Sequence, residues 1–134
     1  MRFSTRLQTV YSPVVPFSSP IRNPTMAIQH AVSGEPVSVL PPVNAAGERQ
    51  TVALFKTQEL EVMRVVLLKG RSMPAHKVAG DITVQCLEGA ICFHSDGKDQ
   101  VLASGDMLYL AGGVVHSLTA IEDACALVHI VLRK

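Results

Sequence analysis

The sequence of this protein contains no block of lysine or arginine. Its 12 basic and 11 acidic residues leave a formal net charge of +1 over 134 residues. Binding to nucleic acid or to an anionic membrane surface needs a concentrated positive field, so the sequence predicts no nucleic-acid and no membrane partner. Apolar runs such as 65–68 and 124–132 are also far shorter than the ~20 residues that span a bilayer. We therefore expect a soluble protein.

The chain is also poor in cysteine, and its three cysteines include no C-x-x-C pair. An odd number without such a pair is untypical of a disulfide scaffold and of a zinc knuckle. Reduced thiols are typical of the cytosol, so we predict a cytoplasmic protein. Cys86, Cys92 and Cys125 lie in apolar runs, where free cysteine usually packs as a small buried side chain. Cys86 shares the strand parity of Ile82 and Val84, so it is the cysteine that we consider for a pocket.

No acidic residue precedes Glu35, and the first 25 residues hold four of the eight prolines and three arginines. Proline interrupts regular hydrogen-bonded structure, so we do not expect this stretch in a core. It lacks the apolar run of a secretory signal. A disordered tail and a start codon assigned upstream of Met26 both fit. We predict an N-terminal extension over residues 1–25 and a single domain over residues 26–134.

From residue 50 onward, short runs rich in β-branched residues alternate with turn sequences. Asp96-Gly97 has the chemistry of a tight hairpin turn. The segment 59–69 also contains good helix formers, but Val62, Val65 and Val66 favour a strand. Many short strands at regular spacing are typical of a sandwich or barrel, so we predict an all-β fold. The expected strands are 51–56, 59–69, 82–87, 90–94, 100–103, 107–110, 114–120 and 124–132.

Two blocks in this β region carry histidines at a characteristic spacing. The first has Gly70, His76 and Gly89, and the second has Gly113 and His116 after Gly105. They resemble the paired motifs of the cupin superfamily. In metal-binding members the first motif is Gly, five residues, His-x-His, three or four residues, Glu, six residues and Gly. The second is Gly, five residues, Pro-x-Gly, two residues and His. The resemblance covers about residues 50–132 and implies a small RmlC-like cupin, a double-stranded β-helix or jelly-roll barrel around a central pocket.

The departures from these motifs bear on the chemistry. Val78 stands at the position of the family's second histidine, and Ile82 stands at the position of its glutamate. The resemblance therefore implies a degenerate metal motif, in which His76 and His116 are the ligands that remain. Two imidazoles without a carboxylate hold a divalent ion weakly, with zinc, nickel or copper favoured over iron.

Residues two and four apart on a strand point to the same side, so positions 76, 78 and 82 are expected to face one interior. We predict a mostly apolar pocket with His76 and His116 as metal ligands. Its expected apolar lining is Val78, Ile82, Val84 and Cys86. A third ligand from outside the motifs has weaker candidates, which are His94, His129, Gln85, Asp81 and Cys86.

These features favour a cupin that binds a small molecule in its barrel and has a weak two-histidine metal site. One alternative is a metal-dependent enzyme of the isomerase or oxygenase type, with a third ligand from outside the motifs. Another is a free-standing sensor barrel like those attached to some bacterial transcription regulators. The resemblance also implies a homodimer, with residues 36–56 as the interface.

Overall fold

The computed structural model describes residues 30–40 and 50–133 of the chain. The extension predicted at residues 1–25 lies outside the described residues, so the domain boundary at residue 26 stays a prediction. The described residues contain no helix of the length and apolar character that crossing a membrane requires. Their regular structure consists of strands, which confirms the predicted all-β class.

Nine strands follow one another along the described chain. All eight predicted runs became strands, and their bounds agree with the prediction to within about two residues at each end. The strands are β1 (Val52–Lys56), β2 (Leu60–Leu67), β3 (Ser72–His76), β4 (Ile82–Glu88), β5 (Ala90–Ser95), β6 (Lys98–Ala103), β7 (Met107–Leu110), β8 (His116–Ala120) and β9 (Ala124–Val131).

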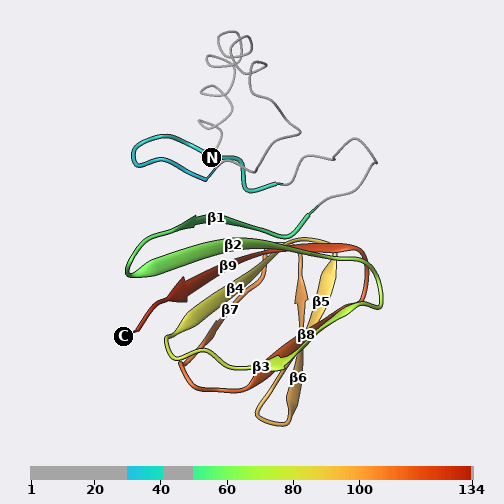
Figure 1. Ribbon diagram of the computed structural model, residues 1–134. Coiled ribbons are helices and arrows are strands. Elements are labelled where there is room, and N and C mark those ends of the chain that lie inside the picture. The colour runs from blue at the N-terminus through green and yellow to red at the C-terminus, as the bar shows by residue number, and fades with distance from the viewer. Residues whose placement is uncertain (1–29, 41–49, 134) are drawn as a thin grey trace, which may run out of the picture.

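The strands form two antiparallel sheets that face each other (Figure 1). The five-stranded sheet has the order β1-β2-β9-β4-β7, and the four-stranded sheet has the order β3-β8-β5-β6. Most strands that are neighbours in sequence, such as β4 and β5, lie in different sheets, and the exceptions are the β1–β2 and β5–β6 pairs. The chain therefore crosses repeatedly from one sheet to the other, and this encloses a central core.

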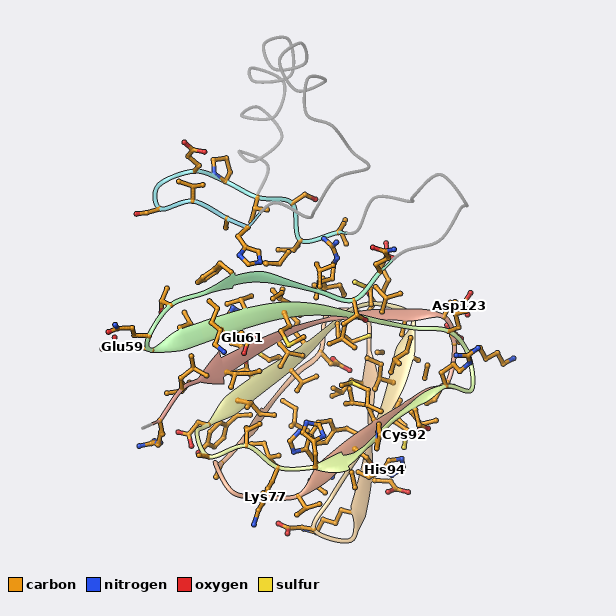
Figure 2. All side chains as sticks on the ribbon, in the orientation of Figure 1. Glu59, Glu61, Lys77, Cys92, His94 and Asp123 are labelled. Atoms are coloured by element: carbon orange, nitrogen blue, oxygen red, sulfur yellow. The ribbon has the colours of Figure 1, made fainter. Side chains whose placement is uncertain are left out.

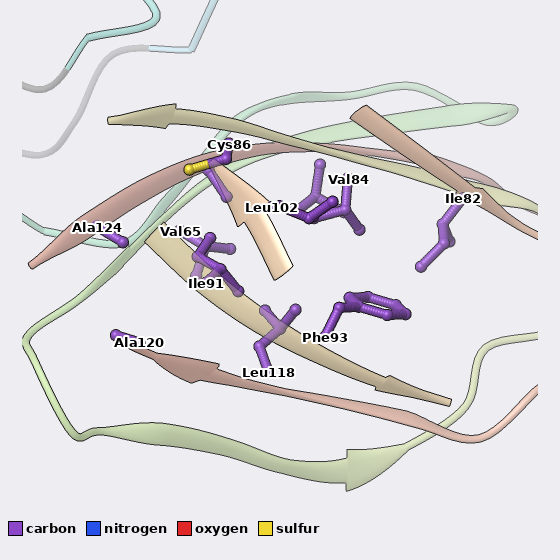
Figure 3. Close-up of a cluster of buried hydrophobic side chains, with 12 residues drawn as sticks. Val65, Ile82, Val84, Cys86, Ile91, Phe93, Leu102, Leu118, Ala120 and Ala124 are labelled. Carbon is purple, nitrogen blue, oxygen red and sulfur yellow. The ribbon is translucent and has the colours of Figure 1, made fainter. Parts of the chain in front are cut away.

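Alternating side chains of both sheets meet between them. On β5, Ile91 and Phe93 are 1% and 0% exposed, while Cys92 and His94 between and after them are only partly buried. Figure 3 shows the inward side chains filling the space between the sheets, with Val84 and Ile82 from β4 above Phe93 and Leu118. Burial of such apolar side chains supplies about 1.5–3 kcal/mol each, which favours this parity over a slip by one residue.

The β5–β6 hairpin confirms the turn predicted at Asp96-Gly97. Asp96 has a φ of 50° and Gly97 has a φ of 71°, and two consecutive positive φ angles are what a type I′ hairpin turn requires. The turn sets Ser95 opposite Lys98 and His94 opposite Asp99. Asp96 and Gly97 therefore fix the register of the whole hairpin.

Strand β3 is absent from the sequence prediction. Its sequence has no β-branched residue and contains Pro74, which cannot donate a ladder hydrogen bond and argues against a central strand. In the structure β3 lies at the edge of its sheet and pairs only with β8, and its register shifts between Met73 and His76. Proline is tolerated there because an edge strand with an irregular register leaves one side of the backbone unpaired.

Candidate ligand and metal pocket

His76 and His116 lie opposite each other where β3 ends and β8 begins. Their Cα atoms are register partners in the β3–β8 pair, and their ring centroids are 4.4 Å apart at an interplanar angle of 55°. The antiparallel pairing of these two strands brings together residues that are 40 positions apart in sequence. The two motif histidines therefore form one pair in space.

The two imidazoles have the same hydrogen-bonding arrangement. His76 Nδ1 donates to the carbonyl oxygen of Pro74 at 3.0 Å, and His116 Nδ1 donates to the carbonyl oxygen of Val114 at 3.0 Å. A carbonyl only accepts, so in each neutral ring the proton is on Nδ1 and the lone pair is on Nε2. Both rings thus have Nε2 as the atom that can accept a hydrogen bond or bind a metal.

Phe93 fixes the orientation of His116. The two rings are stacked with centroids 5.6 Å apart and an interplanar angle of 8°. Phe93 is fully buried and His116 is 6% exposed, whereas His76 is exposed. The pair therefore has a buried member inside the barrel and an exposed member at its mouth.

A cavity of about 60 Å³ adjoins the two histidines. None of its lining residues carries a formal charge, and its chemistry is apolar apart from the imidazoles. Val78, Ile82 and Val84 are on this lining. The expectation that positions 76, 78 and 82 alternate along one strand is wrong, because β3 ends at His76, β4 begins at Ile82, and Val78 lies between them. The lining comprises His76, His116, Met63, Val65, Met73, Val78, Ile82, Val84, Leu118, Val128 and Ile130.

Cys86 is the predicted pocket residue that does not line this cavity. Its side chain is 0% exposed within the core, and its thiol donates to the carbonyl oxygens of Glu88 at 3.4 Å and Gly89 at 3.6 Å. In Figure 3 it lies at the opposite end of the core from Ile82. Burial raises the pKa of the Cys86 thiol, and the charge of Asp106 adds to the shift. Cys86 is therefore placed as a packing residue.

The other four candidates for a third ligand also lie away from the cavity. Asp81 accepts a hydrogen bond from the Gly112 N–H at 2.9 Å, and His129 Nδ1 is 3.2 Å from Thr83 Oγ1. Thr83 and Gln85 alternate with the inward Ile82 and Val84, so they and His129 are on the outer face of the five-stranded sheet. His94 is on the outer face of the other sheet, beside Asp99.

Two methionines of the lining were not predicted from the sequence. Met63 comes from β2 and Met73 comes from β3, and both residues line the same cavity as the histidines. Met63 has the parity of Val65, which was a usable signal for an inward position. Met73 had no such signal, because β3 itself was not predicted.

The loop before β8 is hydrogen-bonded to the segment that follows His76. Gly113 N–H donates to the carbonyl oxygen of Val78 at 2.8 Å, and Gly113 adopts a φ of 84°. Glycine reaches this left-handed region without a Cβ clash. The motif glycine therefore has a local role, since its backbone holds Val78 against the cavity.

No protein-family model matches this chain, and no curated protein matches it. Several solved structures are similar to it. A conserved protein of unknown function from Streptococcus pyogenes has a TM-score of 0.65 and 22% identity, over 84% of this chain and 99% of the other. A cupin superfamily protein from Desulfitobacterium hafniense has a TM-score of 0.64 and 16% identity, over 81% and 100%. Salicylate 1,2-dioxygenase from Pseudoaminobacter salicylatoxidans has a TM-score of 0.57 and 18% identity, over 63% and 27%.

These similarities show that the chain has the cupin fold, the double-stranded β-helix of RmlC-like cupins. The fold implied by the two motif blocks is thereby confirmed. The same fold serves an oxygenase and a protein of unknown function, so the fold alone does not define the chemistry. The chemistry has to be inferred from the residues that line this chain's own cavity.

Proposed function

We propose that this protein binds a small, mostly apolar molecule in the cavity between its sheets, with His76 and His116 contacting the polar group of that molecule. The observation that carries the proposal is the composition of the lining, which has nine apolar side chains and two imidazoles. Apolar walls with few convergent polar groups are typical of small-molecule sites. The tethered Nδ1 atoms leave Nε2 of each ring for the ligand.

The size of the cavity limits the ligand. At ~10–15 Å³ for each water-sized probe, a volume of about 60 Å³ accommodates roughly four to six such probes. A ligand enclosed here has about that many non-hydrogen atoms. A neutral imidazole Nε2 accepts a hydrogen bond, so the matching ligand is a short aliphatic molecule with a hydroxyl or a protonated carboxyl group.

The same Nε2 atoms supply a weak metal site as the second part of the proposal. Thioethers favour copper(I), and imidazole suits copper, zinc and nickel. Met63 and Met73 line the same cavity as the histidines, and the lining contains no carboxylate. Copper is therefore the first candidate, with zinc and nickel after it, and iron fits this donor set worst.

The enzyme alternative needs a third donor at the histidine pair. Among residues 30–40 and 50–133, no group of three His, Cys, Asp or Glu donors includes His76 or His116. An isomerase or oxygenase therefore requires a donor from elsewhere, so we rank binding above catalysis. The homodimer, the sensor role and the cytoplasmic location stay predictions from the sequence.

Metal binding is tested by plasma mass spectrometry of the full chain without an affinity tag. The protein carries Cys92→Ser, because Cys92 lies close to His94 and Asp99 in a separate group of potential metal ligands. It is equilibrated with copper(I), zinc or nickel before excess metal is removed. We expect bound copper in this protein, its loss in a His76→Ala/His116→Ala variant, and its retention in His129→Ala. Equal metal content in the first two proteins contradicts the metal site.

Ligand binding is tested by saturation-transfer NMR with 1-butanol as the probe. We expect a transfer signal from the parent protein and its loss in Val78→Phe, where the larger ring fills the cavity. The matched control is Val101→Phe, because Val101 is 61% exposed on the surface and outside the lining. The same signal from both variants, or none from the parent, overturns the binding proposal.

A further inference from the structure

A second group of donor side chains lies on the outer face of the four-stranded sheet. Cys92 and His94 are two residues apart on β5, so they share one face, opposite to the inward Ile91 and Phe93. Asp99 on β6 is the register partner of His94. Figure 2 shows Cys92 and His94 next to each other near β8 and away from the five-stranded sheet. One hairpin thus presents a thiol, an imidazole and a carboxylate together.

The donor atoms of these three side chains all lie within 4.8 Å of one another. Cys92 Sγ is 4.0 Å from His94 Nδ1, and His94 Nδ1 is 2.5 Å from Asp99 Oδ1. With Zn–S, Zn–N and Zn–O bonds of ~2.0–2.3 Å, donors of a tetrahedral zinc site are roughly 3.3–3.7 Å apart. The observed separations lie on both sides of that range, so ligation requires rotations that bring the thiol closer to the imidazole and move the carboxylate away from it.

The other ring nitrogen of His94 is also held. Its Nε2 is 3.4 Å from Thr119 Oγ1, and Thr119 Oγ1 is 2.8 Å from Ser72 Oγ. Thr119 is the register partner of both Cys92 and Ser72, so three strands support one ring. Metal-binding histidines typically bond their second nitrogen to a neighbouring polar group, which fixes the ring. With Nδ1 on a metal, Nε2–H donates to Thr119 and Thr119 donates to Ser72.

The site is open to an incoming ion. The side chain of His94 is 36% exposed and that of Asp99 is 68% exposed, while Cys92 is partly buried. Burial raises the pKa of the Cys92 thiol, and the negative charge of Asp99 adds to this shift. A divalent cation reverses both effects, because it neutralises the carboxylate and displaces the thiol proton.

We propose that Cys92, His94 and Asp99 bind one zinc ion on the outer face of the four-stranded sheet, with water as the fourth ligand. The soft thiolate, the imidazole and the carboxylate are all donors that zinc accepts in tetrahedral geometry. Within the described part of the chain, it is the only group of three such donors. This site is separate from the pocket of His76 and His116, and it does not depend on the function proposed for that pocket.

Cobalt(II) is the probe for the test, because it replaces zinc and shows a thiolate-to-metal charge-transfer band that imidazole ligands cannot produce. Titration of the full chain is expected to give this band with one equivalent, and added zinc is expected to remove it. Cys92→Ser is expected to abolish the band. Asp99→Asn, at an exposed position, is expected to weaken cobalt binding at least tenfold. Thr119→Val is expected to weaken it about 10-fold through the ring orientation.

The control is His76→Ala/His116→Ala, which is expected to keep the band unchanged. Absence of the band in the parent, its persistence in Cys92→Ser, or its loss in the pocket variant each overturns the proposal. If Cys92→Ser does not fold, the site is tested on the unaltered chain by the protection of Cys92 from alkylation. Zinc is expected to slow alkylation of Cys92 by iodoacetamide at least tenfold, read by mass spectrometry of its peptide, and an unchanged rate contradicts the site.

Discussion

Val78 and Ile82 occupy the positions at which the resemblance implies the missing metal ligands. Both line the cavity together with His76 and His116. We therefore predict that Val78→His/Ile82→Glu converts the weak two-histidine site into a four-ligand site. The added imidazole and carboxylate complete a donor set that binds zinc, nickel or iron(II).

The expected loss of stability in this variant follows from the burial of Ile82, which is 4% exposed. Removing a buried isoleucine side chain costs about 1.5–3 kcal/mol, and burying an unpaired carboxyl group costs about 1–3 kcal/mol more. Without metal, the variant is thus expected to lose roughly 2.5–6 kcal/mol of unfolding free energy. Metal at 1,000 times its dissociation constant restores about 4.1 kcal/mol, so most of the loss is recovered.

The assay is urea unfolding of the parent and the double variant, with and without zinc. Thr83→Glu is the matched control, because Thr83 is adjacent to Ile82 but lies on the outer face of β4. We expect zinc to stabilise the double variant and to leave Thr83→Glu unchanged. If zinc does not stabilise the double variant, positions 78 and 82 do not converge on the histidines, and our account of the pocket is refuted.

Three further predictions concern the support of the pocket and the packing of the core. Phe93→Leu is expected to destabilise the fold by about 0.5–1.5 kcal/mol beyond the repacking cost, because it removes the ring stacked on His116. Chemical denaturation measures this, and a neutral result contradicts the stacking. Gly113→Ala is expected to cost about 1–2 kcal/mol, because its φ is 84°, and an unchanged unfolding midpoint argues against that conformation. The folded-state pKa of Cys86 lies above its unfolded value, so its contribution to stability is full below the ordinary thiol pKa of ~8.5 and is lost as the pH rises through the folded value. Unfolding measured from pH 7 to 11 is expected to show less alkaline loss in Cys86→Ala than in the parent.

The β-strands were largely predictable because their signals are local. Alternating apolar residues set the inward face, and Asp96-Gly97 set the hairpin turn, without reference to distant residues. The failure at β3 has the same origin. Pro74 is a local signal against a strand, and the edge position that tolerates it depends on how the sheets assemble.

Parity predicted the face of a side chain but not its place along the core. Val84 and Cys86 have the same parity, yet the structure places Val84 on the cavity and Cys86 beyond its end. Similarly, Met73 gave no signal, because it reaches the cavity only through the pairing of β3 with β8.

By itself, the sequence determined the all-β class and the turns, since each of these depends on residues a few positions apart, and the resemblance to the cupin motifs singled out the two histidines. The tertiary structure decided which donors meet. His76 and His116 become partners through the β3–β8 register, and Cys92, His94 and Asp99 converge through the register of the β5–β6 hairpin. The physical reason is that strand pairing brings together atoms that are distant along the chain, and the pairing is selected by burial of the whole core.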